Sequence, residues 1–353
     1  MILLKYVTMK WHLILLFVFV IFQNVRAFDF YSDGFYFNVY ENSASVAFVD
    51  TCYFMNKQTL EFPEKIKYNG NTLVVDKIFK ISPCRNIKKL IIHKYVRLIG
   101  PFAFAHHDFE RVIINSDTLE ICDGAFISCE KLKSVSINGF VSQIGKSAFA
   151  GCCSLKKFRT KNIQKICNHS FSRCVGLTKF KVPDGVDTFN LISLYDCKNL
   201  KYLFIPQTTK MISPSTGVFN LRKIIVSNNN RHYKSINGVL YTKDEKTIVL
   251  YPNSKKGNHY TILNNTQNIG SLCFFNLRNL DKIYFPDSLE WIGPSAFFYN
   301  KKGLNEVVLP SKEIVYEDMI MPGRIKRRKI LLGDSLETKK IFGKDVKIVV
   351  KNE

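Results

Sequence analysis

Apolar side chains return along this chain at a spacing of 22 to 23 residues. Three segments, beginning at Ile99, Ile144 and Ile292, share the pattern Ile-Gly-x-x-Ala-Phe. Six residues after most copies, a Leu-like residue opens a second pattern, Leu-x-x-Leu-x-Ile or a close variant, as at Leu132 and Leu200. Self-similarity of this period is typical of repeat proteins. The residues that close the first pattern and its weaker copies are Phe104, Phe126, Phe149, Phe171, Leu194, Phe274 and Phe297.

Alternate side chains of the second pattern are apolar, which predicts a short strand with one buried face. A proline often follows, as at Pro183, Pro206 and Pro286, and proline cannot continue a strand ladder. The Ile-Gly-x-x-Ala-Phe pattern predicts a tight turn that leads back across the core. Since one unit cannot bury its apolar face alone, about eight or nine units must stack around one continuous core. The sequence therefore predicts one elongated, β-rich solenoid with one short strand per repeat.

Between Ile81 and Pro310 the chain resembles the BspA-type leucine-rich repeat family of bacterial and protist surface proteins. The specific marks are Ile-Gly-x-x-Ala-Phe-x-x-Cys, strands that end in Ile-Pro, and the segment Gly-Val-Leu-Tyr at 238–241. In this family such segments occur as inserts between repeats. The resemblance implies a leucine-rich repeat solenoid with a role in adhesion or recognition. From the residues themselves, Asn237-Gly238 predicts a two-residue turn, so we expect residues 230–252 to form an inserted β-hairpin that stands out of the solenoid.

The N-terminal segment indicates export. Leu13–Phe22 is an unbroken apolar run of ten residues, preceded by Lys5 and Lys10 and followed by Val25-Arg26-Ala27. This is typical of a secretory signal peptide, which we expect over residues 1–27 with cleavage after Ala27. The alternative is a membrane anchor, but ten residues span only about half of the ~30 Å hydrocarbon core. We therefore expect a secreted or cell-surface protein with no transmembrane span in the mature chain.

The ends of the chain differ from its middle. Residues 28–72 contain Asp33-Gly34 and alternating aromatic residues, which predict a β-rich N-terminal cap. The repeats then occupy residues 73–310. Residues 311–353 are expected to form a C-terminal cap and basic tail. The basic cluster at 324–329 is interpreted as a solvated turn of that cap, with an anion-binding patch or a processing site as alternatives.

The net charge of the chain indicates which binding partners it favours. The chain carries 51 Lys and Arg against 29 Asp and Glu, a formal charge of +22. Such a balance favours anionic partners, which include nucleic acid, acidic glycans and anionic membrane surfaces. Export argues against nucleic acid. We expect an extracellular protein or an acidic glycan as the partner; the oligomeric state is left open.

The outward side chains of the predicted strands form candidate binding columns. Residues two and four positions after each opening Leu point away from the core, because side chains alternate along a strand. Leucine-rich repeat proteins as a class commonly bind ligands on this strand face. The alternative is that lysines only keep an exposed sheet soluble. The candidate ligand-binding residues are Lys89, Arg111, Lys157, Arg159, Lys179, Lys181, Tyr202, Phe204, Lys223, Lys282 and Tyr284.

Most of the ten cysteines fall in repeat columns. Five lie three residues after a closing position, where His107 fills the same slot in one repeat. Columns of this kind need a small buried side chain, so we expect free thiols in the interior. Cross-turn disulfides are the alternative, because an exported protein meets oxidising conditions. The five are Cys84, Cys129, Cys152, Cys174 and Cys197.

Two Asn-x-Ser/Thr sequons, at Asn168 and Asn264, are candidate glycosylation sites, with Asn264 the better candidate because Ser170 fills a slot that is usually buried. We predict no catalytic residues, no metal site and no cofactor. The segment 139–147 superficially suggests a phosphate-binding loop, but its two glycines are one residue too far apart. Cys-x-x-Cys pairs are absent, and the His106-His107-Asp108 run has no partner at ligand spacing. A soluble pattern-recognition or decoy module is the alternative function, and a secreted enzyme on a repeat scaffold is a distant third.

Overall fold

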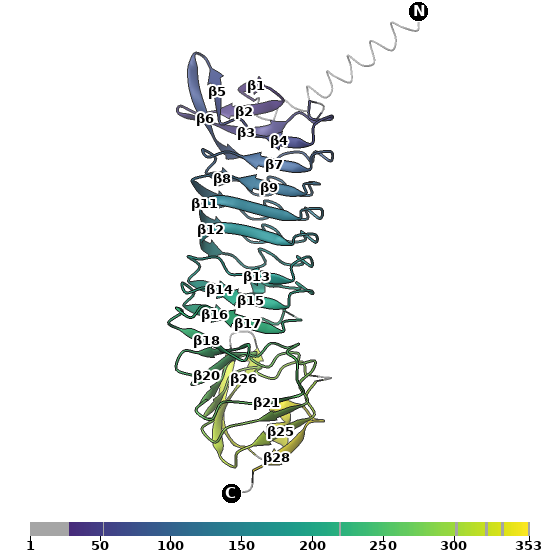
Figure 1. Cartoon of the computed structure of the whole chain (residues 1–353), viewed down its shortest axis with the longest axis vertical. Helices are drawn as coiled ribbons and strands as arrows, with labels where there is room; N and C mark the ends of the chain where they lie inside the picture. The colour runs from purple at the N-terminus through teal and green to yellow at the C-terminus, as the bar shows by residue number, and fades with distance from the viewer. Residues whose placement is uncertain are drawn as a thin grey trace, which may run out of the picture.

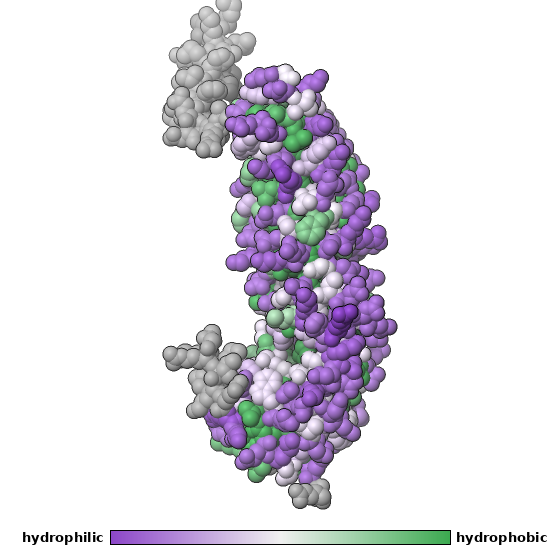
Figure 2. All heavy atoms as spheres, turned by 90° about the vertical axis from the view of Figure 1, so that its left-hand side faces the viewer, coloured by the Kyte–Doolittle hydropathy of each residue, from purple (hydrophilic) through white to green (hydrophobic). Residues whose placement is uncertain are grey.

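The structure is a computed structural model that describes residues 28–51, 53–218, 220–300, 303–321, 324–332 and 335–351. Successive turns of the chain stack along one axis into a bent rod with the N-terminal cap at one end (Figures 1 and 2). The expected signal peptide, residues 1–27, lies outside the described residues.

The N-terminal cap is hydrogen-bonded to the repeats. Its antiparallel strands β1 (Phe30–Ser32), β2 (Phe35–Val39) and β3 (Ser43–Val49) are followed by β4 (Thr59–Glu61), β5 (Lys65–Tyr68) and β6 (Asn71–Ile78). β3 pairs with β6 in parallel, β6 pairs with β8 of the first turn, and β4 pairs with β7. The cap therefore presents a parallel edge on which the first repeat can stack.

Most turns of the solenoid contain two short strands, not one. The first strands follow the Leu-x-x-Leu-x-Ile pattern, and the second strands precede the Ile-Gly turn. Both sets pair in parallel with their equivalents in neighbouring turns. The first strands are β7 (Lys89–Ile92), β9 (Arg111–Ile114), β13 (Lys179–Lys181), β15 (Tyr202–Ile205) and β17 (Lys223–Val226); the second are β8 (Leu98–Ile99), β10 (Thr118–Ile121), β14 (Thr188–Asn190) and β16 (Met211–Ser213). In two turns a single long strand serves both sides: β11 (Ser134–Ile144) and β12 (Lys157–Ile166). A 3-10 helix, η2 (Leu191–Leu194), follows β14.

The expected hairpin forms an integral part of the solenoid. Strands β18 (Tyr233–Ile236) and β19 (Val239–Thr242) pair antiparallel around Asn237 and Gly238, both of which have positive φ. Contrary to the expectation that it stands out, Val239, Leu240 and Tyr241 are fully buried. Leu240 packs in the core of the preceding turns, whereas Val239 and Tyr241 pack in the core of the following turns. The hairpin thus joins two cores.

The C-terminal turns continue the same design. One sheet contains β20 (Thr247–Leu250), β22 (Asn268–Ile269), β24 (Trp291–Ile292), β26 (Glu313–Met321) and β27 (Arg324–Leu331); the other contains β21 (His259–Thr261), β23 (Lys282–Tyr284), β25 (Glu306–Leu309) and β28 (Lys347–Val350). Helix α2 (Leu336–Phe342) is N-capped by the Ser335 hydroxyl. The basic cluster at 324–329 lies in β27, which pairs antiparallel with β26. Our interpretation of this cluster as a turn was therefore wrong.

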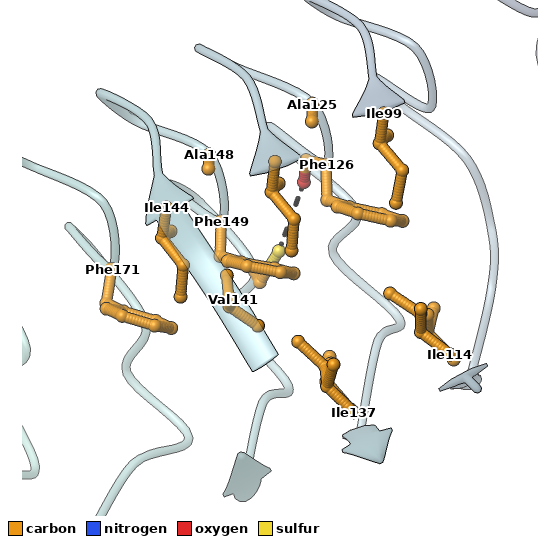
Figure 3. Close-up of a cluster of buried hydrophobic side chains, with 14 of the residues drawn as sticks. Ile99, Ile114, Ala125, Phe126, Ile137, Val141, Ile144, Ala148, Phe149 and Phe171 are labelled. Carbon is orange, nitrogen blue, oxygen red and sulfur yellow. Dashed lines mark hydrogen bonds between the residues drawn. The ribbon is translucent and has the colours of Figure 1, made fainter. Parts of the chain in front are cut away.

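The closing aromatic residues stack along the solenoid interior, as predicted (Figure 3). Adjacent ring centroids lie 5.2 Å apart for Phe104–Phe126, 5.1 Å for Phe126–Phe149 and 5.5 Å for Phe149–Phe171. All four rings are fully buried, and Phe274 and Phe297 repeat the arrangement at 5.0 Å. Main-chain bonds fix the register, because the amide of each aromatic residue donates to the carbonyl before the next one, as from Phe126 to Ala148.

Strand pairing is interrupted on two sides between the β12 turn and the next turn, at a place that we call the seam. There β12 pairs with β11 but with neither β13 nor β14 (Figure 1). On these two sides a single main-chain bond joins the turns, from the Ile163 amide of β12 to the carbonyl of Asp184, which lies between β13 and β14. The side of the solenoid that carries the closing aromatic residues remains hydrogen-bonded, since the Phe171 amide still donates to the Ser193 carbonyl. The seam coincides with Phe158, whose ring packs edge-on against Phe149 and Phe171.

Candidate functional site

The first strands place the predicted binding residues in lateral rows. Parallel register brings Lys89, Arg111, Ser134 and Lys157 side by side across four turns. The second and third rows are Lys179–Tyr202–Lys223 and His259–Lys282–Glu306–Lys347. We call this surface the first-strand face. Period-2 alternation positions its residues, because Val112, Val135 and Leu203 between them are buried.

Positive charge on this face concentrates on both sides of the seam. Lys157 and Arg159 of β12 and Lys179 and Lys181 of β13 are all exposed. Among the described residues, only Lys181 of these four has an ion pair, at 3.3 Å to Asp184. An exposed pair of this kind contributes little free energy. Three cations therefore face solvent without a counter-charge.

Farther toward the C-terminus, an acidic residue neutralises the lysines of the first-strand face. The Lys282 ammonium group pairs with the Glu306 carboxylate, which Lys347 approaches within 3.3 Å. The hydrogen bond from Lys282 holds the pKa of Glu306 below its usual value, and the same bond raises the pKa of Lys282. The Lys282 Nζ also lies 4.9 Å from the Tyr284 ring centroid. These two predicted residues are therefore engaged within the protein, unlike those at the seam.

Aromatic and aliphatic side chains adjoin the cations. Tyr202 is 39% exposed and lies beside Lys179 in the parallel register. Phe204, its neighbour on the same face, is half-buried and lies beside Lys181. The combination of apolar contact area with unpaired cations is suited to a large anionic partner.

The interior cysteines form a thiol column. The Sγ atoms of Cys129, Cys152, Cys174 and Cys197 donate to the carbonyl of the closing aromatic residue one turn earlier, at 3.0 to 3.2 Å. Burial raises the pKa of the Cys197 thiol to about 12. All nine cysteines that the structure describes carry free thiols. Asn300 fills the same slot in the last repeat and donates to the Phe274 carbonyl at 2.8 Å, an equivalence that the cysteine pattern alone did not show.

Both sequon asparagines are exposed, whereas their hydroxyl partners are buried. Ser170 donates to the Gly145 carbonyl at 3.0 Å, and Thr266 donates to the Glu245 carbonyl at 3.2 Å. Within the described ranges, no three His, Cys, Asp or Glu side chains converge as metal ligands would. The helices of those ranges are too short or too polar to cross a membrane.

Sequence reasoning missed a groove on the opposite, second-strand side of the seam. It has a volume of about 1190 Å³ and is lined by the ends of β10, β11 and β12 and by β14 and β16. None of the predicted ligand-binding residues lines it. The predicted binding residues of β12 and β13 therefore flank the seam on the first-strand face. The groove, which the sequence did not predict, opens on the second-strand side.

Comparison with known proteins identifies the repeat type. A sequence model described as the BspA type leucine-rich repeat region, in six copies, matches residues 50–174, 153–238 and 250–335. These segments together span well over half of the chain. No curated protein gives a significant match.

Several solved structures share the fold. The pneumococcal vaccine antigen PcpA has 20% identity and a TM-score of 0.57, over 80% of this chain and 70% of that one. A leucine-rich repeat protein from Eubacterium ventriosum has 27% identity and a TM-score of 0.52, over 60% of this chain and 56% of that one. A leucine-rich cell surface protein from Faecalibacterium prausnitzii has 16% identity and a TM-score of 0.50, over 92% and 95%.

Proposed function

Because this chain belongs to the BspA-type leucine-rich repeat family, we propose that it is a secreted or cell-surface protein that mediates adhesion or recognition. Its partner would be an acidic glycan or an acidic surface of an extracellular protein, bound on the first-strand face. We assign it no catalysis of its own. The cell-surface description of the Faecalibacterium prausnitzii protein supports this placement.

The observation that carries the proposal is the unpaired charge at the seam. Lys157, Arg159 and Lys179 are exposed and make no ion pair with any described residue. A cation that is not neutralised within its own chain is available to a partner, and a cluster of such cations attracts anions over several ångströms. Rows of such side chains that run across neighbouring strands fit a long, charged ligand better than a small neutral one.

An array of glycans and matrix proteins, probed at two salt concentrations, tests the partner class. Acidic glycans or acidic proteins should be retained at low salt and released at high salt, because salt screens exposed charges. Retention of neutral glycans alone, unaffected by salt, would contradict the proposal.

Charge reversal tests the face. The substitutions Lys157→Glu, Arg159→Glu, Lys179→Glu and Lys181→Glu together should abolish salt-sensitive retention on an anionic matrix. A matched control reverses four exposed bases outside the face: Lys198, Arg231, Lys243 and Lys246. Both variants have the same net charge, so an equal loss in both would show that total charge, and not this face, determines retention.

Fractionation separates the alternative, a soluble pattern-recognition or decoy module, from a surface adhesin. A surface adhesin should be found with the cells and be released by salt. A decoy module should be found in the culture medium from the start.

A further inference from the structure

The groove on the second-strand side presents polar groups from five consecutive turns. Gln143 and Lys146 come from the end of β11 and the turn after it, and Gln164, Lys165 and Asn168 come from the equivalent part of the β12 turn. Among the described residues, none of these five side chains has a hydrogen-bond or ion-pair partner. The groove therefore combines three free amides with two free ammonium groups.

The opening exists because the second-strand ladder is interrupted at the seam. Where second strands of adjacent turns do pair, as β14 does with β16, the ladder closes the space between them. β12 and β14 do not pair, and the groove lies over this interruption. The bond from the Ile163 amide to the Asp184 carbonyl, at 2.9 Å, still holds the two turns together at one end. An added peptide strand needs about 4.8 Å on each side, so this bond argues against strand insertion.

Charge is graded along the groove. Glu120 lines one end, Lys146 and Lys165 line the next two turns, and Asp187 and then Lys210 line the turns beyond them. Lys165, the Asp123 carboxylate and Lys146 all act electrostatically on the Cys167 thiol, and the main-chain amide of Lys146 donates to Asp123 Oδ1 at 2.6 Å. A ligand with a single carboxylate fits the cationic middle.

The lining also distinguishes among small ligands. It contains no aromatic ring, so a saccharide bound here is held by polar contacts and not by ring stacking. Hydroxyl groups of Thr188, Thr208 and Ser213 add further donors and acceptors. We infer that the groove is a binding site for a carboxylated saccharide, whose carboxylate lies between Lys146 and Lys165 and whose hydroxyl groups bond to Gln143, Gln164 and Asn168. This site goes beyond the proposed function, because it uses no residue of the first-strand face.

Two acidic probes with different sources of the carboxylate test the inference: 3′-sialyllactose and tri-galacturonic acid, with lactose as the neutral control. The mature chain is produced in a bacterial host, so that Asn168 carries no glycan. Affinities are measured by titration calorimetry and saturation-transfer NMR. At least one acidic probe should bind tenfold or more tightly than lactose. Failure of both acidic probes to bind, or equal binding of lactose, would overturn the inference.

Variants locate the site. The double substitution Lys146→Gln with Lys165→Gln should weaken the acidic probe tenfold or more, and Gln164→Ala should weaken it severalfold. The matched control Lys243→Gln with Lys246→Gln should bind as the unmodified protein does. The fourfold charge reversal of the first-strand face should also leave this binding intact, which separates the two sites. Unchanged affinity in the Lys146/Lys165 variant, or loss of affinity only in the first-strand variant, would overturn the assignment.

Discussion

The Cys174 thiol donates a hydrogen bond of 3.2 Å to the main-chain carbonyl of Phe149, one turn earlier in the solenoid. The same bond recurs between Cys197 and Phe171 at 3.1 Å. Each bond joins two of the repeat's own columns, the closing aromatic residue and the small residue three positions after it. This explains why cysteine suits the slot: it is small and apolar, and it still supplies a weak donor.

Thiol titration should divide the cysteines into two classes. Cys153 is exposed and should react with a thiol reagent in the native protein at pH 8. Cys174 and Cys197 should not react, because burial raises their pKa and removes them from solvent. In denaturant without a reducing agent, all nine described cysteines should react. A lower number after denaturation would show that disulfides had formed.

Removing one ring of the aromatic column should destabilise the solenoid strongly. Phe149 is fully buried between Phe126 and Phe171, so Phe149→Ala leaves a cavity that neighbouring turns cannot fill. We expect a loss of about 3–5 kcal/mol in the free energy of unfolding, measured by urea denaturation. The control is Phe298→Ala, since Phe298 is 54% exposed and should change the same quantity by less than about 1 kcal/mol. Equal effects of the two substitutions would refute the stacked interior.

His107 should make the protein sensitive to mild acid. It is buried in the cysteine slot, stacked on Phe109 at 4.8 Å, and burial lowers its pKa. In the unfolded chain the imidazole therefore takes up a proton at a higher pH than it does in the folded chain. The free energy of unfolding falls as the pH drops below about 6.5, because protonation then favours the unfolded state. The loss is about 1.4 kcal/mol for each unit by which folding lowers the pKa.

The substitution His107→Cys restores the residue type found in the neighbouring repeats. It should flatten the stability profile between pH 6.5 and 5, and unfolding midpoints measured across that range would show this. An unchanged acid dependence would assign the effect to other groups.

The seam should be visible as fast amide exchange. The Lys201 and Tyr202 amides both donate to the Thr178 carbonyl, at 2.9 and 3.3 Å. The equivalent amides one turn earlier, on Thr178 and Lys179, make no such bonds, because β12 and β13 do not pair. Hydrogen exchange should therefore be at least tenfold faster at Thr178 and Lys179 than at Lys201 and Tyr202. Equal protection would show that the ladder is continuous in solution.

The columns were predictable from sequence because one repeat length corresponds to one turn. Spacing alone placed Phe104, Phe126 and Phe149 in one stack and Lys157 beside Ser134. The seam was not predictable, because spacing determines which residues share a column but not whether adjacent turns close up. That depends on how side chains pack between adjacent turns, which the repeat spacing does not show. The groove follows from the seam and was missed with it.

The second strands and the hairpin were misjudged for related reasons. The residue before Ile-Gly is polar in some turns, as at Gln143 and Asn268. The apolar alternation there is therefore too short to indicate a strand. The hairpin signal at Asn237-Gly238 correctly indicated a turn, but a local turn signal does not determine burial. Val239 and Tyr241 are buried because they continue the apolar interior of the turns on that side.

Hydrogen exchange in the presence of a heparin oligosaccharide, an acidic glycan probe, tests the central claim most directly. The protein carries Lys146→Gln and Lys165→Gln, so that the groove cannot contribute. If the first-strand face is the binding surface, exchange of the exposed amides at Thr178 and Lys179 should slow on addition of the probe, and the segment 243–246 should not change. Slowed exchange at 243–246, with Thr178 and Lys179 unaffected, would contradict the account.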